Sequence, residues 1–294
     1  CIRDRLMIGD TDQLPSVGAG AVLLDLINSM KMNHVKLTKI FRQESGSAIN
    51  INAQLINKGI MPYQNTNKIS DFYIFYFDNA TMIYNKLINL ISNNLQDINS
   101  RYKSKDLMQE LQILTPMHKG ELGSINLNNS LQHIFNNTNA KKIEITIAKK
   151  QYKYHINDKV IQIVNNYQKG VFNGDIGLII AINEQKKQLI VKYQEKNVLY
   201  EYQDLIELRL AYAISIHKSQ GSEFPIILIP LSTQHYTLLA RKLLYTAVTR
   251  AKKLAIILTQ QKAMQITINN NKEAQRLTNL ENKIINYCKE LQVF

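Results

Sequence analysis

The chain has 294 residues, of which 45% are apolar and 20% are charged, with 11 Gly and 5 Pro. This composition excludes a disordered tail and is sufficient for one large or two smaller domains with a buried core. The formal net charge of +13 favours a polyanionic partner, although the lysine-rich proteins of AT-rich genomes carry the same excess.

The two cysteines, Cys1 and Cys288, offer neither a disulfide framework nor a metal-binding pair. No apolar run reaches the roughly 18 residues that cross a bilayer, and no secretion leader is visible. A cytoplasmic protein without a membrane partner is therefore expected.

Strands and helices alternate over the first half of the chain. Apolar and β-branched runs predict strands at residues 6–10, 35–41, 71–77 and 111–115, and helical spacing predicts helices at residues 20–27, 43–57, 81–95 and 122–135. Such alternation indicates a parallel sheet covered by helices.

The pattern changes after about residue 150. Short strands are expected at residues 159–164, 177–182, 188–193 and 198–202, with turn signals between them. Closely spaced strands without helices predict a small β-barrel inserted into the α/β domain. The alternation resumes from residue 210, and residues 272–291 are typical of an amphipathic helix.

Residues 9–18 read GDTDQLPSVG and follow an apolar run. An amide such as that of Gln13 can donate to a phosphate oxygen and accept from an attacking water, so it suits a sensor of the terminal phosphate of ATP. The alternative is a polar turn that caps a helix, and the length of the block favours the site.

Two arginines end apolar runs. Arg42 ends a predicted strand, and Arg250 ends the helical segment at residues 244–250. A guanidinium aimed at a transferring phosphoryl group stabilises the charge that develops on it. A surface ion pair is the usual role of a single arginine, but the apolar run before each one indicates that both point into a site.

Residues 217–226 read HKSQGSEFPI. The side chains of His217, Lys218, Ser219 and Gln220 are all donors, which suits a sugar-phosphate backbone held without reading its sequence. Gly221 permits close approach of the backbone to a ligand, and Glu223 could reach a ribose or a metal-bound water. The alternatives are a structural histidine and a solvated lysine.

Residues 115–120 read TPMHKG and repeat this donor chemistry at another predicted strand end, more weakly. No carboxylate cluster suited to a two-metal nuclease is apparent.

These motifs together resemble those of one family. Residues 9–18 resemble motif III of the RecD-like helicases of superfamily 1B, and residues 41–43 resemble motif IV. Residues 213–224 and 245–250 resemble motifs V and VI. Residues 158–175 resemble the small Src-homology-3-like barrel that this family inserts before motif V.

The resemblance implies a RecA-like parallel sheet with helices on both faces and an inserted all-β barrel. It divides the chain into the end of a first RecA-like domain (1–30), the first part of a second one (31–150), the barrel (151–207) and the second part (208–294). The implied activity is that of an ATP-dependent DNA helicase that moves 5′ to 3′ along single-stranded DNA, with ATP and Mg²⁺ between two RecA-like domains.

The resemblance also implies roles for individual residues. Those implied to contact the γ-phosphate are Gln13, Arg42 and Arg250, and those implied to bind the nucleotide are Gly9, Asp10, Gln13, Gly221 and Glu223. Those implied to hold DNA are Thr115, Pro116, His118, Lys119, His217, Lys218, Ser219 and Gln220.

One departure from the family is clear. No Gly is followed by Lys-Ser or Lys-Thr, so the phosphate-cradling loop is absent, and no Asp-Glu pair remains to hold Mg²⁺. The family places both before motif III. The chain is thus expected to be a C-terminal portion, whose partner is the N-terminal RecA-like half in the same or another chain.

Two functions follow as alternatives. One is the C-terminal part of a helicase that acts in DNA repair or recombination. The other is an ATPase-inactive remnant that binds single-stranded nucleic acid. A purely structural or interaction domain leaves unexplained why two arginines and a glutamine all end apolar runs.

Overall fold

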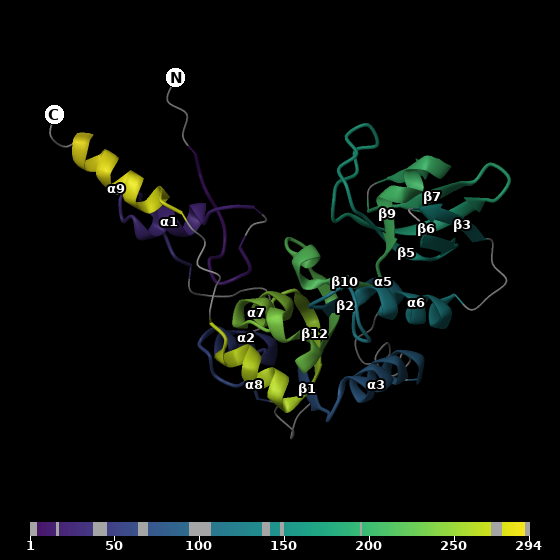
Figure 1. The fold of residues 1–294 in the computed structure, drawn as a ribbon, viewed down its shortest axis with the longest axis horizontal. Coiled ribbons are helices and arrows are strands. Elements are labelled where there is room, and N and C mark those ends of the chain that lie inside the picture. The colour runs from purple at the N-terminus through teal and green to yellow at the C-terminus, as the bar shows by residue number, and fades with distance from the viewer. Residues whose placement is uncertain are drawn as a thin grey trace.

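A five-stranded parallel sheet forms the centre of the molecule (Figure 1). The computed structural model describes residues 5–15, 18–37, 46–63, 70–93, 107–136, 142–147, 150–194, 196–271 and 278–291. The strands lie in the order β1 (Phe72–Tyr76), β12 (Ala251–Thr259), β11 (Phe224–Leu231), β2 (Leu111–Thr115) and β10 (Ala213–Ser215). Each adjacent pair is parallel, as the alternation of elements predicts.

Helices cover both faces of this sheet, which confirms the predicted fold class. One face packs against α2 (Ala48–Asn57), α7 (Arg241–Val248) and α8 (Gln261–Asn269). The other packs against α3 (Ala80–Asn93), α5 (Leu107–Glu110) and α6 (Ser124–Phe135). In β11, Ile227 belongs to the first apolar cluster and Ile226 to the second, because successive side chains of a strand point to opposite faces.

A small antiparallel barrel interrupts the parallel sheet between α6 and β10. Its strands run β8 (Asn197–Tyr200), β7 (Gln188–Lys192), β6 (Ile176–Asn183), β5 (Lys159–Gln162) and β9 (Leu208–Leu210). A 3₁₀ helix, η1 (Tyr202–Glu207), links β8 to β9, and alternate residues such as Val160, Ile179 and Val191 fill a separate core. The predicted barrel is confirmed.

A two-stranded hairpin, β3 (Lys142–Ile147) and β4 (Lys150–His155), precedes β5. Ile143 of β3 is buried in the barrel core, although it lies before the expected domain boundary at residue 150. The division of the chain at residues 30, 150 and 207 stays a prediction.

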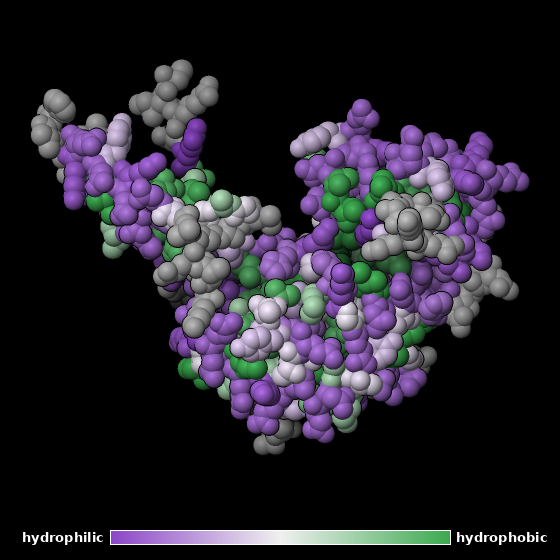
Figure 2. All heavy atoms as spheres, in the orientation of Figure 1, coloured by the Kyte–Doolittle hydropathy of each residue, from purple (hydrophilic) through white to green (hydrophobic). Residues whose placement is uncertain are grey.

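The helix α1 (Val22–Asn28) packs on α9 (Leu280–Leu291), beyond the edge of the parallel sheet (Figure 1). The Thr278 hydroxyl donates to the buried Asp25 carboxylate at 2.7 Å and joins the two segments. Figure 2 shows a hollow between this helix pair and the barrel.

The strand expected at residues 6–10 is not formed. Leu6 is 86% and Ile8 is 88% exposed, and no strand of the described chain lies beside them. A strand requires a neighbour to satisfy its backbone groups, so apolar content alone is insufficient here. Of the strand expected at residues 35–41, residues 35–37 are irregular and the rest lie outside the described residues.

Candidate nucleotide and nucleic-acid site

The predicted phosphate-sensing loop docks on α7. The Leu14 amide donates to the Thr246 hydroxyl at 2.8 Å, and Lys242 donates to the Thr11 carbonyl at 2.6 Å. The Gln220 amide donates to the Leu14 carbonyl at 2.7 Å. Segments more than 200 positions apart in the sequence therefore meet at this loop.

Gln13 and Arg250 are in direct contact. The Arg250 guanidinium donates to Gln13 Oε1 at 2.5 Å, to the Ser222 carbonyl at 3.2 Å and to the Thr246 carbonyl at 3.2 Å. Arg250 is only 4% exposed, so protein oxygen atoms, rather than water, stabilise its charge. The convergence of these two side chains, which the sequence predicts, is observed.

Asp10 orders the loop from within. Its carboxylate accepts from the Gln13 amide and from the Asp12 backbone N–H, both at 2.9 Å. Burial, with the negative charges of Asp10 and Asp12, raises the pKa of Tyr245 to about 12, so the Tyr245 hydroxyl stays protonated at neutral pH. Gly9 lies against Leu23, whose Cδ2 would be 2.7 Å from an added Cβ.

The other predicted nucleotide residues are less clearly placed. Arg42 lies outside the described residues. Gly221 has a φ of +80°, which favours glycine, and no atom would lie within 4 Å of an added Cβ. Glu223 forms an ion pair with Lys252 at 2.8 Å. A nucleotide role for Gly221 and Glu223 stays a prediction.

The predicted DNA-binding residues divide into exposed and buried groups. His118, Lys119 and His217 are exposed. Burial and the nearby His118 lower the pKa of His217. The two histidines follow the ends of the paired strands β2 and β10. Both strand ends lie at one edge of the sheet, where parallel α/β proteins bind ligands.

Three of the predicted residues are buried. Thr115 and Ser219 are fully buried, and their hydroxyls donate to the carbonyls of Leu122 (2.6 Å) and Ile216 (2.7 Å). Pro116 is also buried. These side chains shape the loops, and a direct contact with DNA by any of the eight predicted residues stays a prediction.

Lys218 lies on the 3₁₀ helix η2 (Ile216–Ser219) and faces the barrel. Its ammonium group is 3.5 Å from the Asn173 side-chain oxygen. Burial and the neighbouring Arg209 lower the pKa of Lys218. The barrel and the parallel sheet thus contribute jointly to this surface.

Sequence reasoning missed an aromatic pair beside this contact. Tyr167 and Phe172 are 78% and 46% exposed, and their rings meet edge to face with centroids 5.9 Å apart. The turn signal at Asn173-Gly174 is visible in the sequence, but nothing in it distinguishes these aromatic residues from those of a strand face.

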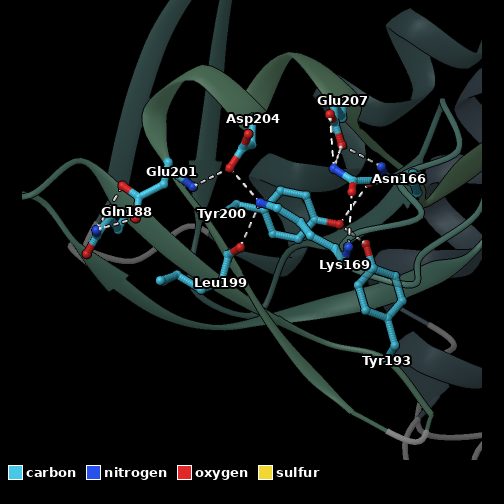
Figure 3. A network of polar contacts seen from close by, with 10 residues as sticks. Asn166, Lys169, Gln188, Tyr193, Leu199, Tyr200, Glu201, Asp204 and Glu207 are labelled. Atoms are coloured by element: carbon cyan, nitrogen blue, oxygen red, sulfur yellow. Dashed lines mark hydrogen bonds and ion pairs between the residues drawn. The ribbon is translucent and has the colours of Figure 1, made fainter.

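A polar network fixes the loop that carries this pair (Figure 3). The Asn166 amide donates to Glu207, and Lys169 donates to Asp204 at 2.5 Å and to the Leu199 carbonyl at 2.9 Å. The buried hydroxyls of Tyr193 and Tyr200 belong to the same network and are 2.7 Å apart. Because several elements hold the loop, its two exposed rings are presented on a rigid support.

The described part of the chain contains no helix long and apolar enough to cross a membrane. Nor do its described residues group three His, Cys, Asp or Glu side chains as a metal site would require. Arg250 and Gln13 carry the donors that suit a phosphate.

Three family models match the chain. They describe a RecD-like DNA helicase SH3 domain at residues 127–193, a UvrD-like helicase C-terminal domain at residues 210–258 and an AAA domain at residues 4–71. The fold and these matches therefore define the class of helicase domains with a RecA-like parallel sheet.

Two curated relatives make the assignment more specific. The ATP-dependent RecD2 DNA helicase of Deinococcus radiodurans is 30% identical over 94% of this chain and 35% of its own length. The RecBCD enzyme subunit RecD of Buchnera aphidicola is 27% identical over 90% of this chain and 51% of its own length. The chain belongs to the RecD-like helicase family, and it spans about a third of the first of these relatives and about half of the second.

A solved structure shares the fold. Pif1 helicase from Bacteroides, in complex with ADP-AlF3 and single-stranded DNA, aligns over 97% of this chain and 66% of its own, with a TM-score of 0.51 and 19% identity.

Proposed function

We propose that the chain is the C-terminal part of an ATP-dependent 5′-to-3′ DNA helicase, which couples ATP hydrolysis to movement along single-stranded DNA in repair or recombination. The observation that carries this proposal is the contact between Gln13 and the buried guanidinium of Arg250. A γ-phosphate at this point would meet a fixed positive charge and an amide that can also orient water.

The same geometry suggests how the nucleotide loop and the DNA surface are coupled. Gln220 and Lys218 lie in the same turn of the chain. The Gln220 amide donates to the Leu14 carbonyl, and Lys218 faces the barrel. A displacement of the loop on binding ATP would therefore shift the strand contacts of η2. Such a change requires only that ATP binds one arrangement better than the other.

The aromatic pair extends the proposed path of the strand onto the barrel. An exposed ring beside a lysine is the combination that holds single strands without sequence preference, because every base can stack and every phosphate is negative. We propose that bases stack on Tyr167 or Phe172 while Lys218 contacts the backbone.

The phosphate-cradling loop and the Mg²⁺ ligands are proposed to come from the N-terminal RecA-like half. When bound there, Mg²⁺-ATP would supply the transferring phosphoryl group. The residues of this chain would contribute a sensor, a charge-stabilising arginine and the DNA contacts.

The test is ATP hydrolysis by the whole reading frame that includes this chain, with and without single-stranded DNA. We expect DNA to stimulate hydrolysis and Arg250→Ala to abolish the stimulated rate. Arg241→Ala, at the first residue of α7, is the control that should retain it. No stimulation by DNA, or an unchanged rate in Arg250→Ala, contradicts the proposal.

The second candidate is a module that binds single strands but does not hydrolyse ATP. It is favoured by the exposed rings of Tyr167 and Phe172 beside Lys218, a combination that can hold a strand without a nucleotide. DNA binding that weakens with salt and is unaffected by ATP, in a reading frame without a phosphate-cradling loop, would support this candidate.

A further inference from the structure

Asp158 lies at the centre of a buried cluster where the barrel meets the parallel-sheet domain. Its carboxylate accepts four hydrogen bonds: from Gln132 (2.6 Å), Asn136 (2.6 Å), the Tyr212 hydroxyl (2.9 Å) and the His155 amide (2.7 Å). Two donors lie on each oxygen, and Asp158 is 0% exposed. The carboxylate is therefore fully satisfied without water.

The donors come from different parts of the molecule. Gln132 lies near the C-terminal end of α6 and Asn136 caps it, whereas Asp158 is fixed to the barrel because its carbonyl accepts from the Ile179 amide of β6 at 3.0 Å. Gln132 also donates to the Lys153 carbonyl at 2.9 Å. This cluster of Asp158, Gln132, Asn136 and Tyr212, which we call the latch, joins α6 to the barrel.

The latch lies beside a short covalent link. Only Ala211 and Tyr212 separate β9, the last strand of the barrel, from β10, the edge strand of the parallel sheet. A two-residue link allows rotation of the barrel about it unless other contacts prevent this. Tyr212 is part of both the link and the latch. Its ring stacks on Phe135 with centroids 5.3 Å apart, and its hydroxyl donates to the Asp158 carboxylate.

We propose that Asp158 is a positioning residue that holds the barrel in one orientation on the parallel sheet and thereby sets the surface on which the single strand lies. Only the part of this proposal that concerns DNA depends on the proposed function. The barrel loop carries Asn173 and the exposed rings, and Lys218 is carried by η2. Rotation of the barrel would separate these two halves of the proposed strand path.

The substitution Asp158→Asn tests the latch with almost no change in shape. Each carboxylate oxygen faces two donors, so the new NH₂ group would point at donors whichever way the amide is turned. The cluster would lose its acceptor on one side. The barrel would then be held on the parallel sheet mainly by Lys159 of β5, which donates to the Gln109 and Leu111 carbonyls, and by the buried Ile161, so it would sample a wider range of orientations.

The first measurement is the distance between spin labels on the two parts of the full 294-residue chain. Labels are placed at Gln185→Cys, in the exposed β6–β7 turn, and at Lys262→Cys, exposed on α8, after both native cysteines are replaced by serine. We expect a narrow distance distribution in the parent and a broad one in Asp158→Asn. A distribution as narrow as that of the parent would overturn the proposal.

The matched control is Asp25→Asn. Asp25 is also buried and also accepts a side-chain hydrogen bond, but it lies in α1, outside the contact between barrel and sheet. It should leave the label distance unchanged. An equally broad distribution in Asp25→Asn would show general loosening of the fold and overturn the specific role of Asp158.

The second measurement is the affinity for an oligothymidine single strand. We expect Asp158→Asn to weaken binding about tenfold, which is the size of one lost base-stacking contact. Broadened distances with unchanged affinity overturn the positioning role. If the parent binds no strand while the distances still broaden in the variant, the proposed function fails and the latch stands.

A milder variant keeps the test usable if Asp158→Asn does not fold. Tyr212→Phe removes one of the four donors and keeps the ring stacked on Phe135. It should broaden the distance distribution less than Asp158→Asn. If Asp158→Asn cannot be made and Tyr212→Phe does not broaden the distance distribution, the proposal is overturned.

Discussion

The guanidinium of Arg250 illustrates why residue identity matters more than charge in this site. Three oxygen atoms from Gln13, Ser222 and Thr246 surround it in a fixed planar arrangement. A lysine carries the same charge but cannot present donors in three directions from one plane.

We therefore expect Arg250→Lys to destabilise the fold by about 1.5–3 kcal/mol, the usual contribution of hydrogen bonds to a charged group. Urea denaturation of the two proteins measures the difference. Arg241→Lys, at the first residue of α7, is the control change, and a loss as large there would show that replacing an arginine near this helix is destabilising in general.

The hydroxyl of Thr246 is the acceptor that holds the phosphate-sensing loop, through the Leu14 amide. Thr246→Val keeps the shape but removes this acceptor, at a cost of about 1–3 kcal/mol to the docked loop. Hydrogen exchange of the Leu14 amide should become at least about fivefold faster, because 1.4 kcal/mol corresponds to a factor of ten.

The control for this exchange measurement is Thr267→Val. Thr267 is another fully buried helical threonine, whose hydroxyl bonds to the Ala263 carbonyl of its own helix. An increase in Leu14 exchange in Thr267→Val, or none in Thr246→Val, would contradict the assigned role.

At the scale of single elements, η3 (Thr233–Leu238) contains a buried histidine. His235 is 2% exposed, and its Nδ1 accepts from the Ser232 amide at 3.3 Å. Burial lowers the pKa of His235 to about 4. Since an unfolded histidine titrates near pH 6.5, only the unfolded state gains a proton between these values.

Stability should therefore fall as the pH decreases from about 7 to about 4, by up to about 3 kcal/mol from this group. Urea denaturation at several pH values would detect the loss, and His235→Asn should flatten it while retaining an acceptor for the Ser232 amide. The control is His133→Asn, at an exposed histidine of α6, which should leave the pH dependence of stability unchanged. If His235→Asn keeps the pH dependence of the parent protein, the assignment is wrong.

Sequence patterns predicted those elements whose apolar residues find a partner in the folded chain. Residues 111–115 form an apolar run at a strand of the same bounds, and α6 begins within two residues of its expected start. The run at residues 6–8 has similar composition but forms no strand, because pairing depends on a neighbour that composition does not reveal.

The site was predictable only in part for a related reason. Gln13 and Arg250 were found because each ends an apolar run, and the structure brings them together. Asp158, Gln132 and Tyr212 belong to three separate segments with no shared spacing, so their meeting depends on the docking of two domains.

For the whole molecule, the net charge of +13 implies attraction to polyanions, and we propose that Lys218 is the charge that contributes most to holding a strand. Lys218 is half-buried between η2 and the barrel, where a bound strand would be held from both sides. Lys218→Ala should reduce the slope of log affinity against log salt by about 0.7, as expected for one phosphate contact of a single strand.

Binding of oligothymidine over a range of salt concentrations measures this slope. Lys262→Ala removes an exposed charge from α8 and is the matched control for net charge. Equal slopes for Lys218→Ala and Lys262→Ala would mean that the attraction is unspecific.

The strand order of the parallel sheet has a consequence during synthesis. Within the described chain, the aromatic strand β1, which ends at Tyr76, pairs with β12 alone, which begins at Ala251, so the 174 residues from 77 to 250 are translated between them. At the usual elongation rate this is a delay of roughly 10–35 s. The nascent chain on the ribosome must shield an apolar edge for that time, and a transcript truncated before β12 would yield an aggregation-prone product.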